Sequence, residues 1–528
     1  MRPGRGRYIR QWQRALRASQ PEAGRHQDAA HCPGKRSRPR RSAMRQAQPR
    51  IGLKQKFMSI KFGTDGWRAV IADTFTFENL ERVAQATADY WKRHRVKGTV
   101  RHIIVGYDRR FLSEEFAQRT AEVLAANGFQ VTLSDRPVPT PAVSWWVKAS
   151  KAIGGVMITA SHNPPIFNGF KLKAHYGGSA STKLCQGVEA LLGKTRVKNV
   201  SLAIATRSGK VKVKDLHPRY FTALKKLVDF ELIANSKLRF AHEALFGVGA
   251  GCFDQLLAGT TCRVTTLNGQ HDSNFGGINP EPIEKNYARS QAYLKKHPHD
   301  ICLVTDGDAD RIGGMDGRGN LLTTHQLISL LLRHFVRNRR GTGKIAKALT
   351  TTSMVDKFCA AHGLQVIETG VGFKHIAVEQ IKGGVLLGVE ESGSIGFPGH
   401  VPERDGILSG LMLLEMLATE KKPVGKLLSE LEKEFGPHRY ARIDTAFPLD
   451  KRTDLMRYCA KNPPAKLNGS SVVDVRTFDG IKYVAEDSSW LILRGSGTEP
   501  ILRIYAESSS GPAVQKLLKL GRKLTTQV

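Results

Sequence analysis

From Met58 onward, short runs rich in β-branched residues alternate with longer amphipathic runs, and this alternation restricts the chain to an α/β fold. The segment ENLERVAQATADYWKRH has the apolar spacing of a helix, and HIIVGYD follows it as a predicted strand. EEFAQRTAEVLAANG is a predicted helix that closes with Asn-Gly, and FQVTLSD is the next predicted strand. The alternation continues to about residue 436, so we expect several α/β domains, each with its own sheet.

A chain of 528 residues is long enough for three or four domains. A basic stretch at residues 193–215, GKTRVKNVSLAIATRSGKVKVKD, is typical of a domain boundary. We expect three α/β domains followed by a smaller α+β domain. Their predicted ranges are 58–205, 206–317, 318–436 and 437–528.

Residues 1–57 contain 16 lysines and arginines but only two acidic residues, Glu22 and Asp28, and they lack apolar periodicity. Three interpretations stay open: a disordered basic tail, an organellar transit peptide, or a translation start assigned too far upstream. The segment has no apolar core of a secretory signal. All three interpretations exclude it from an active site.

The formal net charge of +34 suits nucleic acid, acidic lipid or phosphorylated small molecules as partners. No nucleic-acid recognition motif is present, so we expect no nucleic-acid partner. No apolar run approaches the ~20 residues that cross a bilayer, and we interpret GILSGLMLLEML as a core helix. Seven cysteines without a C-x-x-C pair indicate a reducing compartment, and the expected location is the cytoplasm.

The motif with the most specific chemistry is ICLVTDGDADRIGGMD, in which a hydrophobic strand is followed by Asp306, Asp308 and Asp310. Three carboxylates so close together repel one another unless a cation lies between them. An EF-hand loop is excluded because Arg311 stands where it needs glycine and Gly317 where it needs glutamate. A solvated acidic turn is the alternative, but a metal site is favoured. Mg²⁺ is favoured over Ca²⁺ because few protein ligands are offered.

A second loop, TASHNPPIFNGFKLK, follows the predicted strand GGVMIT and carries Ser161, His162 and Asn163 in a tight turn, with Lys171 nearby. This pattern fits an activated hydroxyl, but it also fits a plain turn. In LLGVEESGSIGF, Glu390 and Glu391 end a predicted strand. Because neighbouring strand residues point to opposite faces, only one of the two carboxylates can face a given cleft, where it could accept hydrogen bonds from sugar hydroxyls. Taken alone, a solvated charged strand end is the favoured interpretation of this motif.

A fourth loop lies in WLILRGSGTEPILRIYAE. Arg494, Ser496, Gly497 and Thr498 bring a guanidinium, hydroxyls and backbone N–H groups into one turn, which suits a phosphate dianion. A simple hairpin turn is the alternative interpretation.

Together and in this order, the four loops resemble those of the α-D-phosphohexomutase superfamily, which includes phosphoglucomutases, phosphomannomutases and phosphoglucosamine mutases. TASHNPPIFNGFK resembles the phosphoserine loop, DGDADR the metal loop, EESG the sugar loop and RGSGTEP the phosphate loop; FGTDGWR resembles the N-terminal motif. The resemblance covers about residues 60–510. It implies a four-domain, heart-shaped architecture with three α/β domains plus a C-terminal α+β domain, each contributing one loop to a central cleft.

The resemblance also implies residue roles. Ser161 would carry the phosphoryl group, and Mg²⁺ would be held by the phosphorylated Ser161 with Asp306, Asp308 and Asp310. His162 and Lys171 are the candidate acid and base, and Arg311 would contact the transferring group. The expected substrate-binding residues are Arg68, Lys374, Glu390, Ser392, Arg494, Ser496, Gly497 and Thr498.

The activity implied is that of a phosphoglucomutase, which interconverts glucose 1-phosphate and glucose 6-phosphate through a phosphoserine enzyme, with glucose 1,6-bisphosphate as intermediate and primer. The EESG form of the sugar loop points towards glucose. The alternatives are a phosphomannomutase or dual enzyme, a phosphoglucosamine mutase and, in a different class, a metal-dependent sugar phosphatase. The expected partners are small sugar phosphates, and no membrane association is expected. The expected oligomeric state is a monomer or a dimer.

Overall fold

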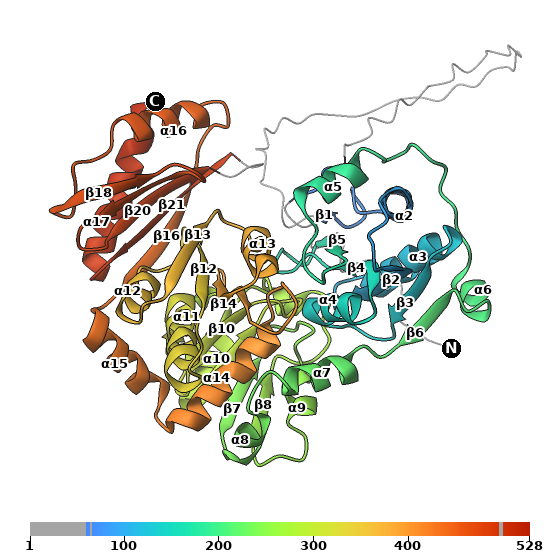
Figure 1. The fold of residues 1–528 in the computed structure, drawn as a ribbon, viewed down its shortest axis with the longest axis horizontal. Helices are drawn as coiled ribbons and strands as arrows, with labels where there is room; N and C mark the ends of the chain where they lie inside the picture. The colour runs from blue at the N-terminus through green and yellow to red at the C-terminus, as the bar shows by residue number, and fades with distance from the viewer. Residues whose placement is uncertain (1–59, 64–65, 496–499) are drawn as a thin grey trace, which may run out of the picture. The chain divides into compact units, whose positions relative to one another are not determined.

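In the residues described by the structure, a computed structural model covering 60–63, 66–495 and 500–528, the strands form four separate β-sheets in chain order (Figure 1). The first three sheets contain parallel pairs and are accompanied by helices, and the fourth is antiparallel throughout. The predicted architecture of three α/β domains and a C-terminal α+β domain is confirmed. The exact domain bounds stay predictions.

The first sheet, in spatial order, consists of β1 (Gly66–Val70), β5 (Phe167–Ala174), β4 (Ala152–Ile158), β2 (Val100–Tyr107), β3 (Gln130–Ser134) and β6 (Val211–Lys214). Its helices are α2 (Phe77–Arg93), α3 (Ser113–Ala126), α4 (Thr140–Ala149), α5 (Thr182–Glu189) and α6 (Leu202–Arg207). Apolar residues of α2 and α3 pack with this sheet in one core cluster, while α4 joins a different cluster. Helices therefore cover both faces of the sheet.

Strand β6 belongs to the first sheet although it lies beyond the predicted boundary at residue 205. It pairs in parallel with β3, and Val211 is buried while Lys212 and Lys214 are exposed. Val213 is exposed as well, so Val211 is the one buried residue of β6, and exposed lysines are typical of a strand at the edge of a sheet. The basic stretch that we interpreted as a boundary thus still contributes to the first domain.

The second sheet consists of β11 (Leu321–Leu322), β10 (Ile312–Asp316), β9 (Ile301–Thr305), β7 (Arg239–Glu243) and β8 (Arg263–Leu267). Its helices are α7 (His217–Lys225), α8 (Phe230–Asn235), α9 (Cys252–Leu256), η1 (Phe275–Gly277), η2 (Glu284–Asn286) and α10 (Ala288–Lys296).

The third sheet consists of β13 (Gln365–Thr369), β12 (Lys344–Ala348), β14 (Val385–Val389) and β15 (Ile395–Gly396). Its helices are α11 (Thr324–Arg333), which continues into η3 (His334–Asn338), α12 (Met354–Ala361), α13 (Phe373–Lys382), α14 (Gly406–Glu420) and α15 (Val424–Phe435).

The fourth sheet consists of β16 (Arg439–Ala446), β21 (Ile501–Ser508), β20 (Trp490–Gly495), β19 (Ile481–Ala485), β18 (Ser470–Arg476) and β17 (Lys466–Leu467). Its helices are α16 (Arg452–Lys461), α17 (Gly511–Leu524) and η4 (Thr525–Gln527). Leucines of α17 and α16 pack on one face of the sheet in a core cluster of their own.

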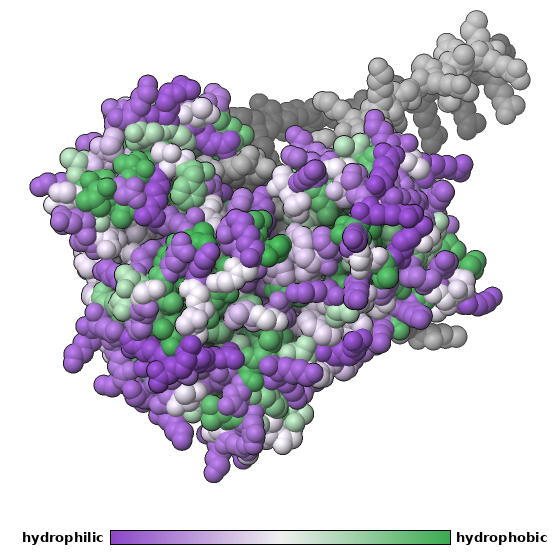
Figure 2. Space-filling model, viewed as in Figure 1, coloured by the Kyte–Doolittle hydropathy of each residue, from purple (hydrophilic) through white to green (hydrophobic). Residues whose placement is uncertain are grey.

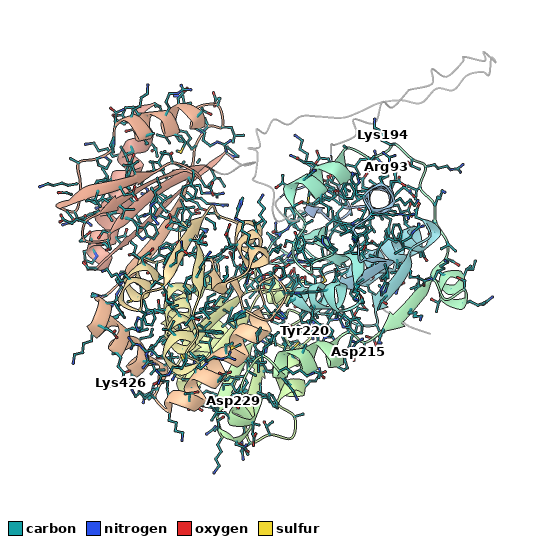
Figure 3. All side chains as sticks on the ribbon, viewed as in Figure 1. Arg93, Lys194, Asp215, Tyr220, Asp229 and Lys426 are labelled. Atoms are coloured by element: carbon teal, nitrogen blue, oxygen red, sulfur yellow. The ribbon has the colours of Figure 1, made fainter. Side chains whose placement is uncertain are left out.

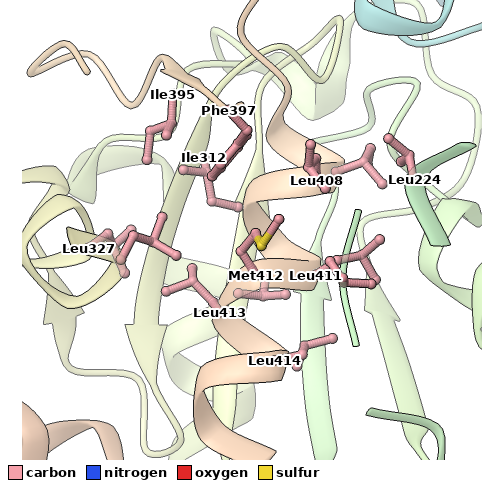
Figure 4. Packing of buried hydrophobic residues seen from close by; sticks show 14 of the residues in the cluster. Leu224, Ile312, Leu327, Ile395, Phe397, Leu408, Leu411, Met412, Leu413 and Leu414 are labelled. Atoms are coloured by element: carbon pink, nitrogen blue, oxygen red, sulfur yellow. The ribbon is translucent and has the colours of Figure 1, made fainter. Parts of the chain in front are cut away.

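Helix α14 lies at the centre of the largest hydrophobic cluster (Figure 4). Its residues from Gly406 to Ala418 are all buried, and it contacts α8, β9 and β10 of the second sheet as well as α11. A helix that is apolar all round is typically a buried one, so the prediction of a core helix for GILSGLMLLEML is confirmed. Through α14, the second and third sheets share one core.

Hydrophilic side chains predominate on the face visible in Figure 2, where hydrophobic residues form small separate patches. None of the helices in the described residues combines the length and hydrophobicity that a bilayer crossing demands.

Candidate active site

The loop that follows β4 turns sharply at Ser161, which is fully buried and has a φ of +53°. Its Oγ donates a 3.0 Å hydrogen bond to Asp306 Oδ2 and lies 3.4 Å from His162 Nδ1. Ser161 belongs to the first sheet's loops and Asp306 to the second's. The fold therefore brings the predicted phosphoserine loop and the predicted metal loop into direct contact.

The metal loop follows β9, a strand in which all five residues are buried. Asp306, Asp308 and Asp310 are each fully buried, and one oxygen from each lies within 4.8 Å of the others. Gly307 permits the close approach of the two loops, because a Cβ at this position would stand 2.6 Å from Ser161 O. Three carboxylates and one serine hydroxyl thus meet in one enclosed place.

The three carboxyl groups differ in their surroundings. Burial, followed by the neighbouring Asp308 and Asp310, raises the pKa of Asp306 well above its usual range. Burial opposes ionisation of Asp310 too, but the charges of Arg404 and Lys171 hold its pKa well below the usual value. The pKa of Asp308 is also lowered, because Lys171 and a hydrogen bond from Thr140 outweigh burial and the charge of Asp310.

This donor set fits a divalent metal ion. Within the described residues, Asp308 Oδ1 and Asp310 Oδ1 are buried without a hydrogen-bond partner. Buried carboxylate oxygens are normally paired or bound to a metal. Clustered carboxylate oxygens are the ligands of hard cations such as Mg²⁺. A cation bound among the three groups would give the unpartnered oxygens a ligand contact. It would also lower the pKa of Asp306 by offsetting the repulsion from its neighbours.

The two predicted acid–base residues lie beside this cluster. Lys171 Nζ, on β5, donates to Asp308 Oδ2 at 2.8 Å and to Asp310 Oδ2 at 3.3 Å, with all three side chains fully buried. Burial lowers the pKa of His162 well below its usual value, and the charges of Arg311, Arg68 and Lys171 add to this effect. The imidazole is therefore held neutral in this environment.

Two predicted anion-binding arginines flank Ser161. Arg68 Nη1, on β1, donates to Asn163 Oδ1 at 2.8 Å in the phosphoserine loop. Arg311 follows the metal loop, and its guanidinium lies 3.9 Å from Glu281 and 4.0 Å from Asp310. Both guanidinium groups thus lie next to the two loops that Ser161 and Asp306 join.

The sugar loop after β14 separates its two carboxylates. Glu390 is buried and accepts a 2.8 Å hydrogen bond from Gly372 N–H, whereas Glu391 Oε2 accepts one from Thr350. Burial raises the pKa of Glu390 despite the nearby charge of Arg404. Gly393 has a φ of +88°, and a Cβ there would stand 2.2 Å from Ile312 O, so glycine lets the sugar loop pack against the metal loop.

The remaining predicted substrate-binding residues lie on the third and fourth domains. Ser392 Oγ is 3.0 Å from Ser394 Oγ, and Lys374 Nζ donates to Thr182 Oγ1 of the first domain at 3.2 Å. Arg494 is the second-last residue of β20, and its Nε donates to Asp479 Oδ1 at 2.9 Å. The predicted positions Ser496, Gly497 and Thr498 lie outside the described residues.

Sequence reasoning missed residues that hold these loops in place. Arg404 Nη2 lies 2.8 Å from Asp310 Oδ2, and the preceding Glu403 forms a buried ion pair with Lys173 of β5 at 2.5 Å. The following Asp405 accepts a 2.7 Å hydrogen bond from Tyr220 of α7. Tyr220 is labelled in Figure 3. The detectable signal was a run of three charged residues, ERD, immediately before the strongly apolar helix α14.

Arg110 was missed as well. It is 3% exposed, and its guanidinium donates to backbone carbonyls of the loop that carries Ser161. The signal was the segment YDRR at the end of a predicted strand. One aspartate and two arginines directly follow the buried end of β2 there.

All four domains of this chain match those of a known enzyme family. The phosphoglucomutase/phosphomannomutase alpha/beta/alpha domain I matches residues 59–198, domain II matches 218–319 and domain III matches 323–435, while the C-terminal domain matches 452–520. The chain belongs to the phosphoglucomutase/phosphomannomutase family. Members of this family are mutases of the phosphohexomutase type, so the protein is an isomerase-type phosphotransferase, and its buried aspartate triad could bind a metal ion.

Relatives of the phosphoglucomutase/phosphomannomutase family carry several substrate names. The chain is 29% identical over 465 residues to a phosphoglucomutase/phosphomannomutase of Thermococcus kodakarensis, covering 88% of this chain and 98% of the relative. It is also 29% identical to a phosphoglucosamine/phosphogalactosamine mutase of Sulfurisphaera tokodaii, with the same coverage. A candidate phosphomannomutase from Thermus thermophilus has a crystal structure similar to this one, with a TM-score of 0.77 and 35% identity over 89% of this chain and 99% of that one. Family membership therefore defines the reaction type and leaves the sugar open.

Proposed function

We propose that this mutase is a phosphoglucomutase, which interconverts glucose 1-phosphate and glucose 6-phosphate through a phosphorylated Ser161. The observation that carries the proposal is the 3.0 Å hydrogen bond from Ser161 Oγ to Asp306 Oδ2, made in a fully buried site between two domains. A nucleophilic hydroxyl, three carboxylates and two flanking arginines are the groups that phosphoryl transfer needs.

In the proposed reaction, the bond between Ser161 Oγ and phosphorus breaks while a bond forms between phosphorus and the free hydroxyl oxygen of the sugar monophosphate. The proton of that hydroxyl passes to a base, and Ser161 Oγ receives a proton from an acid. Lys171 and His162 are the proposed pair, since His162 lies beside Ser161 and Lys171 donates to Asp308 and Asp310. The bisphosphate then turns around and returns its other phosphoryl group to Ser161.

Asp306, Asp308 and Asp310 would hold Mg²⁺ together with the phosphorylated Ser161. Bound there, the ion would draw negative charge from the transferring phosphoryl group as a Lewis acid. Arg68 and Arg311 add positive charge near His162, the residue that follows Ser161. Closure of the site excludes water, which would otherwise hydrolyse the phosphoserine.

Reorientation of the bisphosphate requires that the distal phosphate and the sugar ring be bound equally in both directions. Arg494 with Ser496, Gly497 and Thr498 is the proposed phosphate anchor. Glu390 and Ser392 would accept and donate hydrogen bonds to vicinal ring hydroxyls, and Lys374 contributes a cation from the first turn of α13. Burial of Glu390 supports this role, because a buried carboxylate gains most from ligand hydroxyls.

Glucose is the proposed sugar, and mannose is the alternative, since the two differ only in the configuration at C2. The test is a mutase assay with glucose 1-phosphate, mannose 1-phosphate and glucosamine 1-phosphate, using Mg²⁺ and glucose 1,6-bisphosphate as primer. The expected result is the highest kcat/KM for glucose 1-phosphate without release of inorganic phosphate. A preference for mannose or glucosamine would contradict the proposed sugar, and accumulation of free phosphate would contradict the mutase reaction in favour of a sugar phosphatase.

A cytoplasmic location is part of the proposal. The six cysteines of the described residues are free thiols, which suits a reducing compartment. A monomeric or dimeric state also stays a prediction, which light scattering coupled to size exclusion would test.

A further inference from the structure

The backbone of Ser161 is held at both of its polar atoms. Its φ of +53° lies in the left-handed region, which is unfavourable for residues other than glycine and needs support from the surroundings. Ser161 N–H donates to Thr159 Oγ1 at 2.9 Å, and Ser161 C=O accepts from Arg110 Nη2 at 2.6 Å. Because both groups are engaged, the peptide planes on either side of Ser161 cannot rotate without breaking a buried hydrogen bond.

The hydroxyl of Thr159 is itself oriented by Asp108. It donates to Asp108 Oδ2 at 2.6 Å, which leaves its oxygen lone pairs to accept from Ser161 N–H. Asp108 also accepts from Ser113 Oγ at 2.7 Å and from Arg110 through the backbone N–H at 2.9 Å and Nε at 3.1 Å. Thr159 is fully buried and Asp108 is 1% exposed, so the hydroxyl has one fixed direction.

Arg110 completes the arrangement from the other side of the loop. Besides Ser161 C=O, its guanidinium donates to the carbonyls of Asn163 at 2.7 Å, Pro164 at 2.8 Å and Phe167 at 3.0 Å. One side chain from the end of β2 thereby fixes the whole turn between β4 and β5.

We propose that Thr159 is a positioning residue for phosphoryl transfer, which, oriented by Asp108 and Arg110, fixes the Ser161 backbone so that Oγ points at Asp306. This inference rests on the proposed function of Ser161. Without the Thr159 hydroxyl, Ser161 N–H is buried and unpaired, and rotation of the peptide towards another acceptor moves Oγ away from Asp306. A small misplacement of a reacting group slows a reaction far more than it weakens substrate binding.

The test compares variants of two buried threonines. Thr159→Val removes the hydroxyl at nearly constant volume, and Thr159→Ser keeps it. Thr120→Val is the matched control, since Thr120 is also fully buried in the first domain and its hydroxyl donates to Phe116 C=O within α3. The rate of phosphoryl transfer from glucose 1,6-bisphosphate to Ser161 is measured by quenched flow and intact-protein mass spectrometry, and KM for the sugar phosphate is measured in steady state.

We expect Thr159→Val to slow phosphorylation of Ser161 by about 100-fold with KM changed less than about threefold. Thr159→Ser and Thr120→Val should retain the wild-type rate within about threefold. Thr159→Ala, which removes the same hydroxyl from a smaller side chain, should match the valine variant. Wild-type phosphorylation in Thr159→Val, or equal slowing in Thr120→Val, would overturn the inference.

A second measurement separates this inference from the proposed function. If wild-type protein takes up no phosphoryl group at Ser161, the proposed function fails. Hydrogen exchange of the peptide covering residues 159–168 still tests the positioning. Faster exchange in Thr159→Val than in Thr159→Ser supports it, and equal exchange rejects it.

Discussion

Arg494 Nε donates a 2.9 Å hydrogen bond to Asp479 Oδ1, while Asp479 Oδ2 accepts a 2.7 Å bond from Val371 N–H. Arg494 and Asp479 belong to the fourth domain, whereas Val371 belongs to the third. The next residue, Gly372, donates its N–H to Glu390 of the sugar loop. One carboxylate therefore links the proposed phosphate anchor to the segment that supports the proposed sugar contact.

Asp479→Ala should raise KM for the sugar phosphate about 10-fold, the effect of roughly 1.4 kcal/mol of lost binding energy, with kcat changed less than about threefold. The reason is that Arg494 loses the partner that fixes its guanidinium before substrate arrives. Asp474→Ala is the control, because Asp474 pairs with Arg476 at 2.7 Å in the same domain. Equal KM values in the two variants would rule out the proposed role of Asp479.

Ser161→Ala should lower kcat by about 10⁴-fold or more, because in the proposed mechanism Ser161 carries the phosphoryl group between the two half-reactions. The melting temperature should stay close to that of the wild type, since one hydroxyl is removed without a large cavity. Ser409→Ala, a buried serine on α14, is the control that should keep full activity. Substantial turnover in Ser161→Ala would reject the phosphoserine mechanism.

Mg²⁺ should raise the melting temperature of the wild-type protein over that in EDTA, because a bound cation relieves repulsion among three buried carboxylates. In Asp306→Asn this increase should disappear, and the melting temperature in EDTA should not fall below that of the wild type. Of the three aspartates, Asp306 is the one whose pKa is raised by burial and by its two neighbours. Replacing it with neutral asparagine therefore removes repulsion between carboxylates. Differential scanning fluorimetry with and without Mg²⁺ provides the measurement, and an undiminished Mg²⁺ response in the variant contradicts the metal assignment.

Lys173→Met should destabilise the protein by about 3 kcal/mol, because it leaves Glu403 as an unpaired buried charge. Both side chains are fully buried and their charged atoms are 2.5 Å apart. The double variant Lys173→Met with Glu403→Gln should recover most of the loss, as both charges are gone. Urea denaturation of the two variants measures the difference, and equal stability of the single and double variants would contradict the predicted cost of an unpaired Glu403.

Stability should decrease as the pH falls from 7 to 5, with His325 contributing about 2 kcal/mol of the loss. Burial lowers the pKa of His325 from 6.5 to about 4, so the unfolded chain binds a proton in this range and the folded chain does not. His325→Phe keeps the ring against Tyr440, whose ring centroid is 4.4 Å away, and should flatten this dependence. His94→Phe is the control, since His94 is exposed and stacks on Tyr90. An unchanged pH profile of the melting temperature in His325→Phe would contradict the prediction.

The parts of the site that the sequence could predict are those whose chemistry is local. Three aspartates within five residues after a buried strand predict a metal site without any other part of the chain, because the repulsion among them requires a cation or compensating charges. The same holds for the alternation of strands and helices, which identified the α/β class. In both cases the interacting residues lie within one segment.

The parts that it could not predict depend on partners far apart in the chain. Thr140 and Asp308 are 168 residues apart, and Lys173 and Glu403 are 230 apart. A single charged residue such as Arg404 looks like any solvated arginine until the domains pack. Strand β6 was missed for a related reason, since its lysines made it resemble a linker although Val211 alone packs into the core.

Because Glu403, Arg404 and Asp405 come late in the chain, the site can be completed only late in synthesis. Asp310 leaves the ribosome long before Arg404, and until Arg404 arrives it lacks the guanidinium that lies 2.8 Å away. Ser161 and the three aspartates therefore stand in an unfinished electrostatic environment while the third domain is still being made. A nascent chain ending before residue 404 holds the proposed nucleophile and the three aspartates, yet it lacks the Arg404 guanidinium that pairs with Asp310 in the mature site.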